Sequence, residues 1–310
     1  MRLLRPLLVV FGQSVLVFLI FFAIPGNDPA ARLAGRGAPP ESIAAIRTEF
    51  GLDRPLPVQY AVLMRRLFVT RDLPSFVNRG QLVVPAVMAA APITLVLALG
   101  AAVLWSVAGL LIGAVTARRW DGVVLAAGLV GTSIPIFWLG EVVTLSTQGW
   151  ARAWFGWVPP LGMAPTGVGS FLAQMALPCA TLAVVYAGTY GRVLRTSLRA
   201  AAALPHVQVA RAKGLSPSAV LTRHVLPTAA IPAVSLLGLD IGALVGGGTI
   251  LVEVVFGLPG LGRLTYTALT TLDLAMVMAC TLYAAVLVAL CNALADLVVG
   301  WLTPPRGEAE

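Results

Sequence analysis

Residues 93–116 read ITLVLALGAAVLWSVAGLLIGAVT, an apolar run without a single charged side chain. A helix crosses the hydrocarbon core of a bilayer with roughly 20 apolar residues, so this run is long enough to span a membrane. Similar uncharged stretches lie between four pairs of charged residues: Arg5 and Asp28, Arg79 and Arg118, Arg152 and Arg192, and Asp273 and Asp296.

The composition of the whole chain agrees with a membrane protein. Of the 310 residues, 58% are hydrophobic and only 11% are charged, whereas a soluble domain carries about 25% charged residues. We therefore predict an all-α integral membrane protein with six transmembrane helices. The predicted spans are 7–25, 93–116, 122–146, 174–192, 228–251 and 276–300.

The basic residues indicate how these spans are oriented. Among the short segments they gather in three: 1–6, 117–121 and 193–227. The long segment 26–92 holds eight arginines, but long translocated loops escape the rule that relates charge to orientation. The other short segments, 147–173 and 252–275, contain one arginine each. Because Lys and Arg are enriched in cytoplasmic loops, we predict that both termini are cytoplasmic. The net charge of +8 is then an orientation signal, and no nucleic-acid partner is expected.

The chain divides into two predicted parts. Residues 1–92 hold the first span and an extracytoplasmic helical segment, and residues 93–305 hold the remaining five spans. In the extracytoplasmic segment, Pro40 and Pro57 are placed to start two short amphipathic helices, and Gly51 is placed to end the first. This segment is either a subdomain that packs on the membrane helices or a docking surface for an external partner.

Counting residues excludes several kinds of catalytic site. A phosphate-binding P-loop needs Gly-Lys followed by Ser or Thr, but the single lysine, Lys213, follows Ala212 and precedes Gly214. His206 and His224 are too far apart for a zinc-protease helix, which needs two histidines four residues apart. We expect no catalytic residue, no metal ligand and no cofactor site in this chain.

Two carboxylates lie deep in the predicted spans. Asp240 falls near the middle of the fifth span and Glu141 in the outer half of the third. Charged groups at such depths usually face the interior of the helix bundle or a water-filled path, so both are candidate residues of a translocation pathway. Asp296, near the inner end of the sixth span, is better explained as a structural residue.

The predicted cytoplasmic loop 193–227 contains a short helix, HVQVARA, that Pro205 opens. Gly214 supplies a sharp exit, and Ser216 with Pro217 starts a second helix. The short helix either docks into a groove on a cytoplasmic partner or lies on lipid headgroups.

This loop resembles the coupling loop of binding-protein-dependent ABC importer permeases, whose pattern is EAA, three residues, Gly, nine residues and I-x-L-P. The matching positions here are Gln208, Val209, Ala210, Gly214, His224, Leu226 and Pro227. The Glu, the first Ala and the Ile are replaced. The stretches ARAKGLS and RHVLPTAAIP resemble the peptide/nickel class, in which the Glu is commonly absent.

Other stretches resemble the same class along nearly the whole chain: IPGNDPA, FGLDRPLPVQY, SIPIFWLG, GWVPPLG, VEVVFGLPGLGRL and NALADLVVGWLTPP. The sequence departs from the class at residues 70–76, TRDLPSF, where Arg71 and Pro74 replace two glycines. It also ends in Thr303-Pro304-Pro305-Arg306 instead of Asp-Pro-Arg.

The resemblance implies the first, B-type permease subunit of a dipeptide, oligopeptide or nickel importer, with a type I ABC importer permease fold, in the bacterial plasma membrane. It implies four partners besides membrane lipid: a second homologous permease, an extracytoplasmic substrate-binding protein and two cytoplasmic ATPases that bind ATP and Mg. The coupling contact would comprise His206, Gln208, Val209, Ala210, Arg211, Lys213, Gly214, Leu226 and Pro227.

Three other functions remain open from the sequence. Within the same class, the substrate could be nickel or another metal chelate, or glutathione, because selectivity lies largely in the binding protein. A proton-coupled secondary transporter would use the intramembrane acids as proton carriers. An intramembrane enzyme would need Asp240 and Glu141 close together as an acid pair.

Overall fold

The structure, a computed structural model, describes residues 4–22, 29–34, 37–49, 51–78, 80–116, 133–149 and 166–302, together with Gly128, Gly131 and Gly162. Every regular element in these ranges is helical, and one isolated antiparallel bridge joins Pro74 and Leu82. The prediction of an all-α chain is confirmed for the described residues.

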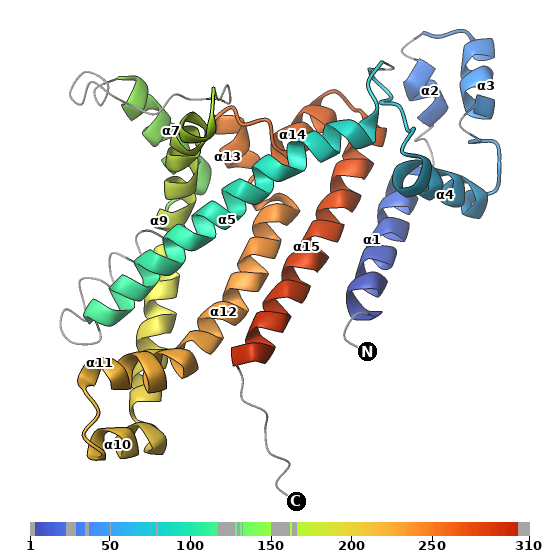
Figure 1. Ribbon diagram of the computed structural model, residues 1–310. Helices are drawn as coiled ribbons and strands as arrows, with labels where there is room; N and C mark the ends of the chain where they lie inside the picture. The colour runs from blue at the N-terminus through green and yellow to red at the C-terminus, as the bar shows by residue number, and fades with distance from the viewer. Residues whose placement is uncertain are drawn as a thin grey trace, which may run out of the picture.

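The helices follow one another along the chain as Figure 1 labels them. Their bounds are α1 Leu4–Phe22, α2 Pro29–Ala34, α3 Pro40–Glu49, α4 Leu56–Arg65, the π-helical turn η1 Arg66–Thr70, α5 Val83–Thr116, α7 Ile136–Gln148, α9 Val168–Ala202, α10 Pro205–Ala212, α11 Pro217–Val220, η2 Leu221–Val225, α12 Leu226–Ala243, η3 Leu244–Gly248, α13 Ile250–Val255, α14 Leu261–Thr270 and α15 Leu274–Leu302.

Four of the described helical segments are long and apolar enough to cross a membrane: Val83–Thr116, Val168–Ala202, Pro217–Gly248 and Leu274–Trp301. They contain most or all of the predicted spans 93–116, 174–192, 228–251 and 276–300. The helices α1 and α7 are shorter and cover part of the other two predicted spans. Because most of residues 122–132 lie outside the described residues, the count of six stays a prediction.

Small residues let α5 and α9 pack closely. A Cβ atom added to Gly109 of α5 would lie 2.6 Å from the Cβ of Tyr190 on α9. One added to Gly191 of α9 would lie 2.4 Å from Ile112 on α5. Transmembrane helices associate through such small residues because lipid supplies no hydrophobic drive between them.

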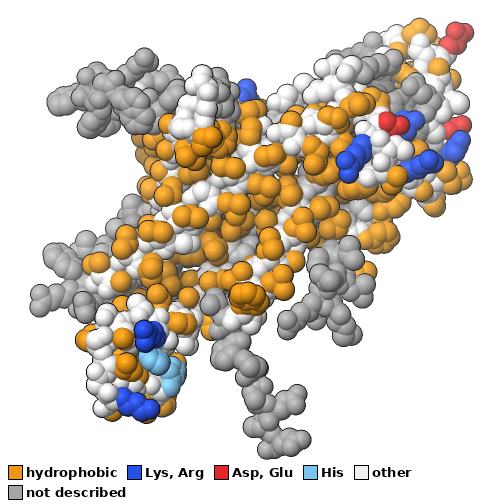
Figure 2. Space-filling view, in the orientation of Figure 1, with side chains coloured by type: hydrophobic (Ala, Val, Ile, Leu, Met, Phe, Trp, Pro, Cys, Tyr) orange, Lys and Arg blue, Asp and Glu red, His pale blue; other side chains and the backbone are white. Residues whose placement is uncertain are grey.

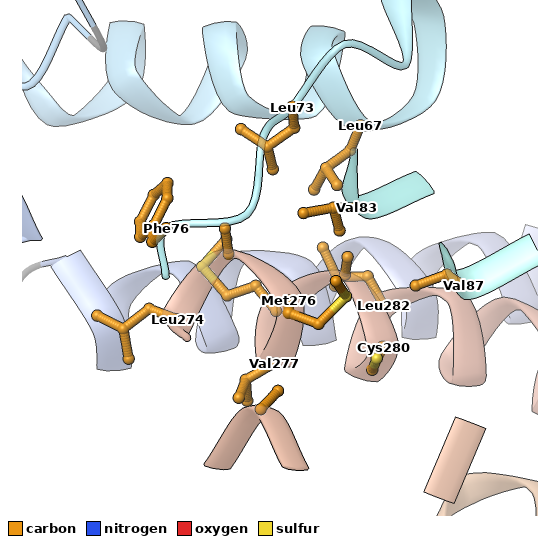
Figure 3. Close-up of a cluster of buried hydrophobic side chains, with 14 of the residues drawn as sticks. Leu67, Leu73, Phe76, Val83, Val87, Leu274, Met276, Val277, Cys280 and Leu282 are labelled. Carbon is orange, nitrogen blue, oxygen red and sulfur yellow. The ribbon is translucent and has the colours of Figure 1, made fainter. Parts of the chain in front are cut away.

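The segment 29–82 packs on the membrane helices at one end of the bundle (Figure 1). Leu67, Leu73 and Phe76 from this segment share one buried cluster with Met276 and Leu282 of α15 (Figure 3). This is the packing that a subdomain resting on the membrane helices requires.

The two short helices of this segment begin and end as the sequence predicts. Helix α3 begins at Pro40, and Gly51, with φ of +64°, follows its end. Helix α4 begins at Leu56 with Pro57 in its first turn. The sequence analysis did not predict α2.

Arg71 adopts a left-handed backbone conformation, with φ of +55°. This is one of the two positions where the peptide/nickel class usually has glycine, so the turn forms even though a side chain replaces it. Backbone hydrogen bonds hold the turn, from Ser75 to Gln81 and from Val83 to Leu73. A non-glycine residue in this conformation costs roughly 1 kcal/mol.

We therefore expect Arg71→Gly to stabilise the chain by up to roughly 1 kcal/mol, because the strain at this position disappears. The apparent melting temperature of the purified protein measures this. Arg71→Ala is the matched control, since it removes the same charge and keeps the Cβ atom. Equal melting temperatures for the two variants would contradict the expectation.

Candidate functional site

The loop between α9 and α12 contains the predicted short helix. Helix α10 begins at Pro205, whose missing N–H is harmless in the first turn of a helix. The backbone N–H of Val207 and that of Gln208 both donate to the carbonyl of Leu204, at 3.0 and 3.2 Å. Helix α10 therefore folds where the sequence predicts it, immediately after the end of α9.

The exit from α10 also matches its prediction. Gly214 has φ of +77°, and its N–H donates to the carbonyl of Arg211 at 3.0 Å. Ser216 then caps α11, because its Oγ accepts a hydrogen bond from the N–H of Ala219 at 3.4 Å. Local chemistry at Gly214 and Ser216 thus turns the chain back toward the membrane.

One face of α10 is buried and the other is exposed. Val207 and Ala210 point into a small apolar cluster with side chains of α9, α11, η2 and α12: Leu198, Ala201, Val220, Val225 and Ala229. The exposed face carries His206, Gln208, Val209, Arg211 and Lys213, and Figure 2 shows basic and histidine side chains gathered at this end of the molecule.

The position of Ala210 corrects the sequence analysis. We expected Gln208, Val209 and Ala210 to share the face that enters a partner's groove, but Ala210 is 4% exposed. Residues three apart lie on the same helix face, so Ala210 shares the buried side with Val207. Ala210 supports α10 from within, whereas Val209, 52% exposed, is the apolar centre of its outer face.

Leu226 and Pro227 lie at the return of the loop and not on α10. Leu226 begins α12 and packs against the cluster that buries Ala210, while Pro227 is exposed in the first turn of α12. These two residues hold the connection between the loop and the membrane helix. The chain thus presents a short helix, firmly braced against two long helices and open on its other face.

Asp240 lies on α12 and accepts a hydrogen bond from Tyr190 of α9. The Tyr190 hydroxyl is 2.7 Å from Asp240 Oδ2. Tyr190 is buried beside Trp105 of α5, and Tyr186 stacks on the same indole with ring centroids 4.6 Å apart. The sequence did not reveal this tyrosine as the partner of Asp240, although a tyrosine in an apolar span usually needs a partner for its hydroxyl.

The structure does not join Asp240 to Glu141. Asp240 is half-buried against α9, and Glu141 is exposed on α7. No hydrogen bond links the two carboxylates, both of which lie in the described part of the chain. Asp296 is exposed near the end of α15.

The sequence analysis did not single out Glu253 as a site residue, yet it is the largest buried acidic side chain among the described residues. Thr94 Oγ1 of α5 donates to Glu253 Oε1 at 2.7 Å, and the backbone N–H of Arg263 on α14 donates to Oε2 at 2.9 Å. Thr94 Oγ1 in turn accepts from the N–H of Leu261 at 2.8 Å. One carboxyl group therefore ties together α5, α13 and α14.

Two glycines make room for this carboxyl group. A Cβ atom on Gly260 would lie 2.4 Å from Glu253 Oε2, and one on Gly262 would lie 2.7 Å from the Cα of Ile250. Burial raises the pKa of Glu253 above its ordinary value of 4.5, and the hydrogen bonds from Thr94 and Arg263 oppose this shift. In the sequence, the run VEVVFGLPGLGRL could have indicated this buried carboxyl group, because it places a single acidic residue, Glu253, close to several glycines.

A second carboxylate on the same side fixes the segment that precedes α5. Asp273 caps α15, where its Oδ1 accepts from the N–H of Met276 at 3.1 Å. The same carboxylate accepts from the N–H of Phe76 at 3.1 Å and from the hydroxyl of Ser75. The turn at 71–76 is thereby joined to the start of α15.

Two family models match the chain in succession. The model of the N-terminal part of the binding-protein-dependent transport system membrane component matches residues 1–98, and that of the inner membrane component matches residues 106–306. The chain therefore belongs to the family of binding-protein-dependent transport system inner membrane components, and it is a multi-pass protein of the inner membrane.

The chain is also similar over its whole length to permeases of named transport systems. A probable D,D-dipeptide transport system permease of Escherichia coli is 33% identical over an alignment of 327 positions, which covers 97% of this chain and 94% of the relative. A putative peptide transport system permease of Brucella abortus is 34% identical, over 92% and 90%. An oligopeptide transport system permease of Haemophilus influenzae is 28% identical, over 98% and 96%.

Proposed function

We propose that this chain is the transmembrane permease subunit of an ATP-driven importer for di- and oligopeptides, and that it forms half of the translocation pathway. The observation that carries this proposal is α10, a braced helix with an exposed face, in a chain of this family. The names of the relatives support peptides as the substrate. In this proposal the chain has six spans and both termini are cytoplasmic.

The partners follow from the same proposal. A second, homologous permease completes the pathway, an extracytoplasmic binding protein delivers the peptide, and two cytoplasmic ATPases bind ATP and Mg. Because Lys213, the single lysine of the chain, lies in no P-loop, ATP hydrolysis is assigned to those partners.

The contact with an ATPase would transmit energy mechanically. The exposed residues of α10, His206, Gln208, Val209, Arg211 and Lys213, enter a groove on the ATPase. Movement of that groove shifts α10, and the buried face at Val207 and Ala210 passes the shift to α9 and α12. Such a contact changes the transport state only if it binds the two states differently.

Uptake into proteoliposomes tests the proposed function. The complex that purifies with this chain should accumulate a labelled dipeptide when ATP and loaded binding protein are present. A proton-coupled transporter would instead need only this chain and a proton gradient. Accumulation of a nickel chelate or glutathione, with no accumulation of dipeptide, would overturn peptides as the substrate.

Asp240 is the better supported of the two candidate pathway residues. Its carboxylate is half-buried, and its Oδ2 is held by Tyr190. A charged group at this depth is costly unless it serves the interior of the bundle or a wet path. Glu141 remains a candidate pathway residue, but its exposure on α7 is the only observation that supports it.

We expect Asp240→Asn to lower peptide uptake by about tenfold, the order of the contribution that a charge adds to a hydrogen bond. Asparagine keeps the shape and can still accept the hydrogen bond from Tyr190. Tyr190→Phe is the matched control, because it removes that hydrogen bond and keeps the carboxylate. Uptake at the wild-type rate by Asp240→Asn, in complexes of equal amount, would refute the pathway role.

A further inference from the structure

Helix α4 and the turn η1 pack against two membrane helices, α1 and α15. Both contacts lie some way below the ends of these helices that are nearest to α4. The Tyr283 hydroxyl of α15 donates to the carbonyl of Leu67 in η1 at 2.9 Å, and the ring of Tyr283 stacks on Phe68 with centroids 5.3 Å apart. On the other side, the Tyr60 hydroxyl of α4 is 2.6 Å from Ser14 Oγ of α1. These contacts set the depth of α4 and η1.

At this depth, η1 lies in contact with the lipid. Tyr283 lies nine residues after the start of α15 at Leu274, which is about 14 Å along a helix axis. With 29 residues, α15 is about 43 Å long and exceeds the hydrocarbon core of about 30 Å by roughly 13 Å. Even if the whole excess projects on this side, η1 lies at the boundary of the hydrocarbon.

The contact with α1 gives the same level. Ser14 lies eight residues before the end of α1 at Phe22, which is about 12 Å below that end. The ring of Tyr60 also packs against Phe18, with centroids 5.4 Å apart. With 19 residues, α1 is about 28 Å long and does not exceed the hydrocarbon core, so this contact also lies no higher than the boundary of the hydrocarbon.

The face of α4 and η1 that points away from the bundle is apolar. Leu63 and Leu67 are buried in the core, whereas Val58 and Val69 are exposed, and Val69 is 72% exposed. Val77, just after the following turn, is exposed as well. An apolar face of this kind is stable when it is immersed in the boundary between headgroups and acyl chains.

Two arginines flank this apolar face: Arg65 and Arg71. Arg65 and Arg71 are exposed, and Figure 2 shows basic side chains gathered over this part of the molecule. One acid lies among them, Asp72, whose pKa is lowered by the hydrogen bond from Thr70 and by the charges of Arg66 and Arg65. Two exposed arginines against one carboxylate leave the patch positive, and long arginine side chains at an interface extend toward the headgroups.

We propose that α4, η1 and the turn through Val77 form an interfacial anchor, which buries Val69 and its apolar neighbours in lipid and binds anionic phospholipid headgroups through Arg65 and Arg71. The anchor lies on the side of the membrane opposite the loop that carries α10 (Figure 1). A soluble partner does not reach this face, because the face lies at the depth of the hydrocarbon boundary.

Quenching by brominated lipids tests the anchor in the full importer complex. A fluorophore is attached at Val69→Cys after replacement of the native cysteines, and the complex is placed in phosphatidylcholine vesicles with brominated acyl chains. We expect strong quenching at position 69. A fluorophore at Ser218→Cys, an exposed residue of α11 outside the residues assigned to the ATPase contact, is the control and should not be quenched. Equal quenching at the two positions would overturn the anchor.

A second arm tests the headgroup preference. At equal content, brominated phosphatidylglycerol should quench the fluorophore at position 69 more than brominated phosphatidylcholine does. Replacing Arg65 and Arg71 together by Gln should abolish this difference, and Arg54→Gln, an exposed arginine before α4, should keep it. No difference between the two lipids in the otherwise unchanged chain would overturn the binding of anionic headgroups.

Discussion

Replacement of Gly214 by Val should abolish the stimulation of ATP hydrolysis by loaded binding protein, while the chain still inserts and assembles. Gly214 has φ of +77°, a conformation that a β-branched residue adopts at a cost of at least about 1 kcal/mol. The loop can relieve this backbone strain by changing its conformation. Such a change would reorient α10 and remove its exposed face from the ATPase groove. ATP hydrolysis by the reconstituted complex, with and without loaded binding protein, measures the effect.

The surroundings of Gly214 supply a matched control. No other atom lies within 4 Å of a Cβ atom placed on Gly214, so the effect of Val comes from the backbone and not from a clash. Asn tolerates the left-handed conformation much better than Val, and Gly214→Asn should keep most of the stimulation. Normal stimulation with Val, or equal loss with Asn and Val, would contradict this explanation.

Removal of the Glu253 side chain should cause the largest loss of stability, because three helices meet at its carboxyl group. Glu253→Ala leaves the Thr94 hydroxyl and the Arg263 N–H without their acceptor in a buried site. Such a loss costs about 3 kcal/mol. The apparent melting temperature and the yield of assembled complex should both fall, and an unchanged melting temperature would refute the structural role.

The pH dependence of stability separates charge from shape at this site. Burial raises the pKa of Glu253 in the folded protein above 4.5, its ordinary value. The contribution of the protonated side chain to the free energy of unfolding is therefore full below pH 4.5 and is lost as the pH rises through the raised pKa of the folded state. Glu253→Gln has no proton to lose, so the stability of the wild type should fall more steeply with rising pH than that of this variant. Parallel curves would contradict a raised pKa.

The sequence predicted well whatever depends on local chemistry or on length. Apolar runs such as 93–116 located the long helices, because the length needed to cross a bilayer is a strong constraint. Pro40, Pro205 and Pro217 located the starts of three helices, since proline suits the first turn. At Gly214, the requirement for positive φ was also visible in the sequence.

The sequence could not predict which side of a short helix faces the bundle. Helix α10 has only eight residues, and its apolar positions, Val207, Val209 and Ala210, do not select a single face. Packing against α9 and α12 decides that Val207 and Ala210 are buried. A charged residue at Ala210 would therefore disrupt the apolar cluster before it could affect a partner, and Val209 is the position at which to probe the contact.

The same limitation explains the partners that the sequence analysis missed. Tyr190 lies 50 residues before Asp240, and Thr94 lies 159 residues before Glu253. Only tertiary packing brings these pairs together. The conformation of Arg71, in contrast, could be predicted from the sequence. The resemblance to the peptide/nickel class indicated a glycine at this position, and Arg71 adopts the left-handed conformation that glycine favours.

The central claim is that the exposed face of α10 contacts a cytoplasmic ATPase, and site-specific cross-linking measures this most directly. A photoreactive group on Val209→Cys should cross-link this chain to the ATPase subunit in the native membrane and block ATP hydrolysis. A group on Val168→Cys, which is even more exposed and lies at the far end of α9, should give no such product. Cross-linking to the ATPase from position 168, or to lipid alone from position 209, would contradict the account.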